Sequence, residues 1–286
     1  SSMIRRKSKE GRYWPKTLAS WDEATSWKTL FEVEDVFWAT VSTRDEDMLK
    51  KGIMFAELCD FNVKPKKDIL AALQANPGTA IMVESPTFFK PMGAVHVRNR
   101  ISQSRPLAID EALDFTVRMG AAEQVAKGYE VSIVTEVASA GEVVWDDLSV
   151  MLIRKGGTGE KRAKEAPAES PGFSESLQWQ LPADMGRRYA AASGDYNPIH
   201  LYPITAKLMG FKRQIMHGMW SKSRCVAELL PASHASAAAV DVAFKLPIFL
   251  PSTVTLLHTT GDSGSRFELR DAKGEKPHLA GELSLG

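Results

Sequence analysis

The sequence of 286 residues contains few cysteines, only Cys59 and Cys225. Two thiols cannot build a disulfide framework, so stability must come from a packed core, for which a chain of this length suffices. Buried free thiols are typical of proteins in a reducing compartment, and we therefore expect a cytoplasmic location. The sequence also lacks the run of about 18 apolar residues that a transmembrane helix needs, so we expect no membrane insertion.

An excess of charge of one sign is also absent. Lys and Arg together number 36 and Asp and Glu number 35, which gives a formal net charge of +1. Nucleic-acid-binding proteins usually show a strong basic excess, so we expect no nucleic-acid partner. A hydrophobic fraction of 44% and a charged fraction of 25% are instead those of an ordinary globular protein. A small local basic patch for a phosphate-bearing ligand remains compatible with this balance.

One low-complexity segment divides the chain. Residues 156–172 (GGTGEKRAKEAPAESPG) are rich in Gly, Pro, Ala and charge, and they contain no large apolar side chain. Such a segment cannot bury enough apolar surface to offset the entropy cost of ordering it, which predicts a linker. The linker would separate an N-terminal domain, residues 1–155, from a C-terminal domain, residues 173–286.

A faint repeat relates these two segments. Five positions of the first segment match positions of the second at one constant offset, 240 − 95 = 145, which is close to half the chain length; three pairs are identical and two are similar. The first set is Val95, Val97, Arg100, Ile101 and Pro106, and the second is Val240, Val242, Lys245, Leu246 and Pro251. We interpret the pattern as two copies of one fold.

Hydrophobic periodicity predicts a helix followed by antiparallel strands in each copy. Alternating apolar residues predict strands over residues 130–137 and 142–153 in the first copy and over 253–259, 266–269 and 279–285 in the second. A helix is predicted over 217–230, where Pro231 stops it, and its counterpart over 68–75. The sequence therefore predicts an α+β fold in which a helix packs on a sheet.

The residues suited to catalysis gather in one segment, residues 192–230. Its SGDYNPIH sequence is rich in turn-forming residues, which predicts a loop. This loop carries a carboxylate, Asp195, and an imidazole, His200, which together can perform general acid–base chemistry on a water near neutral pH. We expect no metal site, because His200 and His217 are separated by a loop and lack other ligands at metal-binding spacing.

Gly218 lies at the start of the predicted helix. Backbone N–H groups in a first helical turn have no intrahelical partner, and the helix dipole helps them to stabilise a developing oxyanion. A glycine also lets a ligand approach the backbone closely. Close packing at the helix start is the alternative explanation for Gly218, and we expect the neighbouring His217 to cap the helix or to pack.

The run SGDYNPIH, followed by AKLMGF and IMHGMW, resembles the hydratase 2 motif of the MaoC-like dehydratases, a family that includes (R)-specific enoyl-CoA hydratases. The resemblance implies a double hot-dog fold, in which two antiparallel sheets each wrap a helix and pair within one chain. The motif is absent from residues 1–155. The resemblance therefore implies that the N-terminal half is non-catalytic and shapes the acyl pocket, while the C-terminal half is catalytic.

The resemblance also implies a reaction, namely (R)-specific dehydration of a 3-hydroxyacyl thioester or, in reverse, hydration of a trans-2-enoyl-CoA. Asp195 and His200 match the catalytic pair of the family, and the N–H of Gly218 matches its oxyanion donor. The predicted substrate-binding residues are Asn197, Lys207, Lys212 and Arg213. The basic residues would meet the phosphates of coenzyme A or of acyl carrier protein, although a solvated loop face is the alternative explanation for them. No metal or other cofactor is implied, and either a monomer or a homodimer is compatible.

Two other functions stay open from the residues alone. A hot-dog acyl-CoA thioesterase would share the fold and change the reaction to hydrolysis, although the Gly-Asp-x-Asn-Pro-x-His loop favours hydration. A non-catalytic module that binds acyl thioesters would share the site without turnover, although an intact acid–base pair argues against it.

Overall fold

The computed structural model describes residues 5–6, 36–42, 94–107, 112–154, 172–193, 195–231 and 237–286. The chain divides into two compact units, and the main part of the second unit begins at Gly172. The predicted helix over 68–75, Cys59 and the predicted linker except Gly172 lie outside the described residues. The assignment of the linker therefore stays a prediction.

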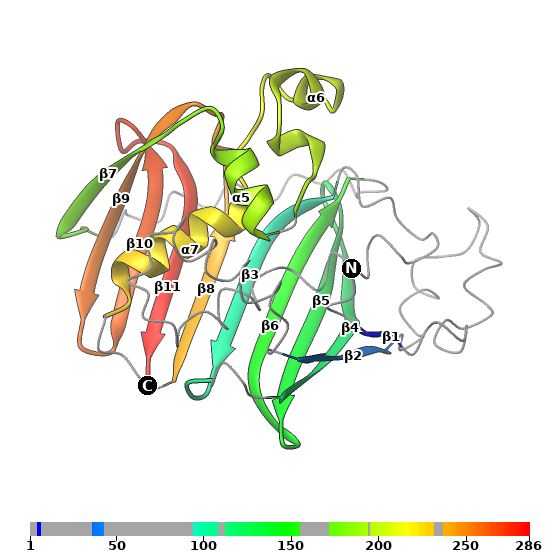
Figure 1. Ribbon diagram of the computed structural model, residues 1–286. Helices are drawn as coiled ribbons and strands as arrows, with labels where there is room; N and C mark the ends of the chain where they lie inside the picture. Colours follow the sequence, from blue (N-terminus) through cyan, green and yellow to red (C-terminus); the bar gives the residue numbers. More distant parts are fainter. Residues whose placement is uncertain are drawn as a thin grey trace. The chain divides into compact units, whose positions relative to one another are not determined.

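The described part of the first unit consists of antiparallel strands (Figure 1). They lie in the order β1-β2-β4-β5-β6-β3. Their bounds are β1 Arg5–Arg6, β2 Val36–Ser42, β3 Val95–Gln103, β4 Ala112–Val125, β5 Gly128–Ser139 and β6 Glu142–Ile153, where the last two residues of β3 fall in the second unit. From Val131 to Ser139 every second residue of β5 is buried, including Val131, Ile133 and Thr135, which confirms the alternation that predicted this strand.

The described part of the second unit combines five antiparallel strands with helices. Its strands lie in the order β8-β11-β10-β9-β7. The strand bounds are β7 Glu175–Leu181, β8 Ala238–Phe244, β9 Ser252–Gly261, β10 Gly264–Asp271 and β11 Pro277–Leu285. The helical bounds are α5 Met185–Ser193, the 3-10 helix η4 Pro198–His200, α6 Pro203–Leu208 and α7 Gly218–Leu229.

The two units repeat one strand connectivity. In the first, the order β2-β4-β5-β6-β3 corresponds strand by strand to β7-β9-β10-β11-β8 in the second. The residues of the sequence repeat begin at Val95 in β3 and at Val240 in β8, so the offset joins equivalent strands. The predicted α+β class is confirmed. The strand order that the two units share is the one expected if they are two copies of one fold.

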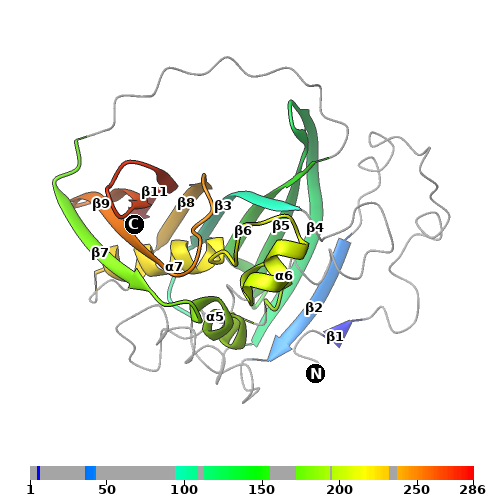
Figure 2. The same ribbon diagram turned by 90° about the horizontal axis from the view of Figure 1, so that it is seen from above.

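Helix α7 lies on one side of the second sheet in both views (Figures 1 and 2). It contacts β8, β10 and β11 and buries Trp220, Cys225, Val226 and Leu229. This helix confirms the one predicted over 217–230, with His217 and Leu230 as its caps. Among the described residues, no helix has the length and hydropathy that crossing a bilayer requires.

Candidate active site

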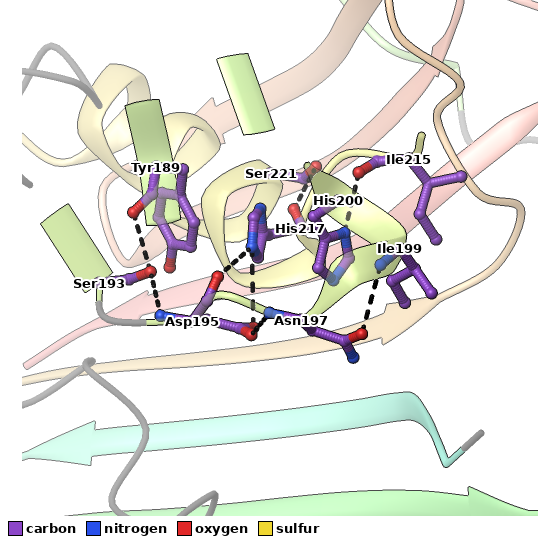
Figure 3. A network of polar contacts seen from close by, with 9 residues as sticks. All are labelled: Tyr189, Ser193, Asp195, Asn197, Ile199, His200, Ile215, His217 and Ser221. Atoms are coloured by element: carbon purple, nitrogen blue, oxygen red, sulfur yellow. Dashed lines mark hydrogen bonds and ion pairs between the residues drawn. The ribbon is translucent and has the colours of Figure 1, made fainter. Parts of the chain in front are cut away.

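In the SGDYNPIH sequence, Ser193 ends α5, residues 195–197 are irregular and Pro198–His200 form η4, while Gly194 lies outside the described residues (Figure 3). The predicted loop is therefore confirmed for residues 195–197. Side chains within it satisfy its own backbone. Ser193 Oγ accepts the N–H of Asp195 at 3.2 Å and donates to the carbonyl of Tyr189 at 2.9 Å. Asn197 donates its N–H to Asp195 Oδ1 at 3.1 Å, and its Oδ1 accepts the N–H of Ile199 at 3.4 Å. Asn197 thus caps the 3-10 turn and holds one oxygen of the Asp195 carboxylate.

Ile215 holds the end of this loop that carries His200. Its N–H donates to the carbonyl of Ile199 at 3.0 Å, and its own carbonyl lies 2.8 Å from Nδ1 of His200. A carbonyl can only accept, so His200 carries its proton on Nδ1 when it is neutral. Nε2 of His200 then bears the lone pair, which is the atom able to take a proton from water.

Ile215 is itself fixed by the segment that follows β8. The N–H of Met216 donates to the carbonyl of Ile248 at 2.8 Å, and the N–H of Leu250 donates to the carbonyl of Gln214 at 3.0 Å. Helix α5 holds the loop from another side, since Arg187 donates to the carbonyl of Leu201 at 3.0 Å. These contacts bring residues 195–200 to the start of α7.

His217 is the residue of this site that the sequence did not assign to the chemistry. Its ring stacks on that of His200, with centroids 3.7 Å apart and an interplanar angle of 27°. Nε2 of His217 lies 3.0 Å from the main-chain oxygen of Asp195 and 3.8 Å from its Oδ2 (Figure 3). The only sequence signal for this role was the position of His217, directly before Gly218.

Asp195, His200 and His217 form one compact cluster. Each offers one nitrogen or oxygen that could bind a metal, and these three atoms lie within 4.8 Å of one another. Spacing along the sequence is therefore no ground against a metal here, because the pairing of residues 214–216 with residues 248–250 brings His200 and His217 together across the loop that separates them. The metal-free character of the site stays a prediction. The Asp195 side chain is 33% exposed, whereas His217 is 2% exposed, so the carboxylate is the group open to a ligand.

Burial keeps both imidazoles toward the neutral form. It lowers the pKa of His200 from the ordinary value of 6.5, while the Asp195 carboxylate and the hydrogen bond to Ile215 oppose part of that effect. Burial also lowers the pKa of His217 well below 6.5, and repulsion from His200 lowers it further. A neutral His200 beside a carboxylate can accept a proton near neutral pH.

Gly218 is the first residue of α7, as predicted. Its N–H is therefore among those without an intrahelical partner. A Cβ at this position would lie 2.9 Å from the ring of Phe244, which gives the glycine a packing reason as well. The packing explanation considered from the sequence is therefore supported, and the role of the Gly218 N–H as an oxyanion donor stays a prediction.

The three predicted basic residues are exposed and lie on the segment after the loop. Lys207 is in the last turn of α6, which is tied to the loop where Thr205 Oγ1 donates to the carbonyl of Pro198 at 2.6 Å. Lys212 follows α6, and Arg213 donates to the carbonyls of Phe249 and Pro251 at 3.4 and 3.3 Å. Their part in substrate binding, like that of Asn197, stays a prediction.

Comparison with known proteins gives this site a family. A family model described as "MaoC like domain" matches residues 162–281, which include the whole cluster. The 3-hydroxyacyl-thioester dehydratase X of Mycobacterium tuberculosis is 35% identical over 193 residues, or 67% of this chain and 68% of that protein. The (R)-specific enoyl-CoA hydratase of Aeromonas caviae is 37% identical over 70 residues, or 23% of this chain and 52% of that protein.

Solved structures agree with these matches. The crystal structure of HtdX from Mycobacterium tuberculosis has a TM-score of 0.71 and 28% identity, covering 87% of this chain and 100% of that one. A MaoC-like dehydratase from Phytophthora capsici has a TM-score of 0.67 at 20% identity, covering 92% and 99%. The second likeness concerns the fold alone, and together they confirm the hot-dog fold. The chain belongs to the MaoC-like dehydratase family, whose members named here are hydro-lyases.

Proposed function

We propose that this protein catalyses the reversible addition of water across the C2–C3 double bond of a trans-2-enoyl thioester, with (R)-stereochemistry at C3. In the opposite direction it is a 3-hydroxyacyl-thioester dehydratase. The observation that carries this proposal is the cluster of Asp195, His200 and His217 directly before the first N–H group of α7. The names of the relatives support the same reaction.

Asp195 and His200 would hold the reacting water between them. One proton of the water passes to this pair, the water oxygen bonds to C3, and a proton from the pair is delivered to C2. The two groups are treated as a unit, because interacting groups titrate and exchange protons as a pair. The lone pair on His200 Nε2, set by the hydrogen bond of Nδ1 to Ile215, suits it to receive a proton.

The N–H of Gly218 would donate to the thioester carbonyl. As the π electrons of the double bond move toward that carbonyl, negative charge develops on its oxygen. A donor already oriented by the helix stabilises this charge without reorganisation at the moment of reaction. Such a mechanism needs no metal or redox cofactor.

The remaining assignments follow from the same proposal. Coenzyme A or acyl carrier protein would carry the acyl chain, with its phosphates near Lys207, Lys212 and Arg213, while Asn197 shapes the loop under the substrate. The N-terminal half would shape the acyl pocket. The enzyme would work in the cytoplasm as a monomer or homodimer.

A direct test is an assay of the hydration of enoyl-CoA esters whose acyl chains have four to sixteen carbons. Loss of the absorbance of the conjugated enone reports the rate, and chiral analysis identifies the product. We expect (R)-3-hydroxyacyl-CoA, and Asp195→Asn should lose on the order of 10²–10⁴-fold in kcat. An (S)-product, or equal activity of wild type and Asp195→Asn, would contradict the proposal. Release of free thiol from saturated acyl-CoA would indicate a thioesterase, and saturable binding without turnover would indicate a binding module.

A further inference from the structure

His217 contacts the acid–base pair on both of its members. Its Nε2 lies 3.0 Å from the main-chain oxygen of Asp195, and its ring stacks at 3.7 Å on that of His200. We propose that His217 is a positioning residue of this site, whose Nε2–H donates to the main-chain oxygen of Asp195 and so holds Asp195 in place beside His200. The activity readouts of this inference rest on the proposed function.

The hydrogen-bond geometry assigns a proton to each ring. The main-chain oxygen of Asp195 can only accept, so Nε2 of His217 must be the donor. Nδ1 of His217 is buried and has no hydrogen-bond partner among the described residues. A proton there would create a buried cation with an unpaired donor, which is costly, so Nδ1 stays unprotonated. His217 is therefore a donor to Asp195 and cannot also serve as the acid at this site.

The contact with His217 completes the attachment of Asp195. Ser193 Oγ holds the N–H of Asp195, and the N–H of Asn197 holds its Oδ1. Ser193 is the last residue of α5, and Asn197 lies in the loop itself. His217 instead belongs to the start of α7, where its own carbonyl accepts the N–H of Ser221 at 3.3 Å. The hydrogen bond from His217 thus ties Asp195 to helix α7, whose first N–H is the proposed oxyanion donor.

A purely packing role would rest on the ring alone. The ring lies between His200 and Tyr189, whose ring centroid is 4.7 Å away. Two substitutions separate the ring from the donor. His217→Phe keeps a stacked ring and removes the donor, whereas His217→Gln removes the ring and places an amide N–H near the position of Nε2.

We expect His217→Phe to lower kcat by up to about 10²-fold with KM nearly unchanged, because a small misplacement of a catalytic group has an effect of this size. His217→Gln should recover most of that loss. Thermal unfolding and binding of the unreactive saturated ester butyryl-CoA, measured for both variants, control for folding. The proposal is overturned if the Phe variant keeps wild-type kcat, or if the Gln variant is as impaired as the Phe variant at equal stability.

A second measurement needs no catalysis. In NMR spectra of histidine-labelled wild-type protein, long-range ¹H–¹⁵N correlations report which ring nitrogen carries the proton. We expect the Nε2–H form for His217 and the Nδ1–H form for His200, with the latter signal perturbed in His217→Phe. An Nδ1–H form for His217 would overturn the inference even if no substrate is turned over. Correct tautomers in a protein inactive toward all enoyl thioesters would instead contradict only the proposed function.

Discussion

His200 and His217 stack face to face, with ring centroids 3.7 Å apart. Two imidazolium ions at this distance would repel each other strongly, and burial penalises each of them further. Over the pH range in which free histidine titrates, at most one of the two imidazoles therefore becomes an imidazolium ion. This relationship sets the pH behaviour of both activity and stability.

Activity should persist below the pH at which free histidine becomes protonated. The proposed base needs an unprotonated Nε2, and burial lowers the pKa of His200 from 6.5. We therefore expect kcat/KM to be constant near neutral pH and to fall on the acidic side with a midpoint below 6.5. A pH–rate profile measures this directly, with the apparent pKa belonging to the coupled site. An acidic limb centred above 6.5 would contradict the assignment of His200.

The free energy of unfolding should decrease as the pH falls, because His200 and His217 are buried in the neutral form. Both histidines have a lower pKa in the folded than in the unfolded state, so the unfolded state binds more protons between those two values. The contribution of the two histidines to the free energy of unfolding should be complete above about pH 6.5. It should fall as the pH drops toward the folded pKa values, by up to about 1.4 kcal/mol per pH unit for each histidine. Urea titrations at several pH values test this, and His217→Gln should reduce the slope. A slope unchanged in that variant would count against the buried, neutral state of His217.

Gly186→Ala should displace the loop that carries His200. A Cβ at Gly186 would lie 2.1 Å from the main-chain oxygen of His200, so either α5 or the loop must shift. We expect a loss of stability of about 1–3 kcal/mol, typical of overpacking, together with a lower kcat. Gly172→Ala is the matched control, because its Cβ would have no neighbour within 4 Å. Wild-type activity and stability in Gly186→Ala would show that the contact is easily relieved.

The two explanations for Gly218 can be separated with Phe244. Gly218→Ala keeps the backbone N–H but places a Cβ 2.9 Å from the Phe244 ring, so we expect lower activity through displacement of the helix start. The double variant Gly218→Ala/Phe244→Leu should recover most of this loss relative to Phe244→Leu alone, measured as kcat/KM. If no activity returns, the glycine is needed for close approach of the substrate rather than for packing against Phe244.

A metal ion bound by Asp195, His200 and His217 should inhibit the enzyme and should not be needed for catalysis. Prolonged dialysis against a chelator should leave kcat unchanged, because a backbone N–H suffices to stabilise the developing oxyanion. Added Zn²⁺ should inhibit by occupying Asp195, His200 and His217, which suit it chemically. Activity that is lost on chelation and restored by a metal ion would require a different mechanism.

Local patterns in the sequence determined the elements and part of the site. The strand predicted over 142–153 coincides with β6, and the helix predicted over 217–230 with α7 and its caps. Short-range periodicity suffices for such elements, because it reports which face of a strand or helix is buried. The loop within SGDYNPIH could be predicted in the same way, because turn-forming residues determine the backbone conformation within a few positions of themselves.

The tertiary structure alone decided the place of His217. It lies 22 residues from Asp195 in the sequence, and their contact depends on pairing residues 214–216 with residues 248–250 and on packing α5 against His200. No periodicity encodes contacts between segments so far apart. The sequence by itself therefore determined which chemical groups are present and on which elements they lie. Long-range packing decided that a second, buried imidazole joins them.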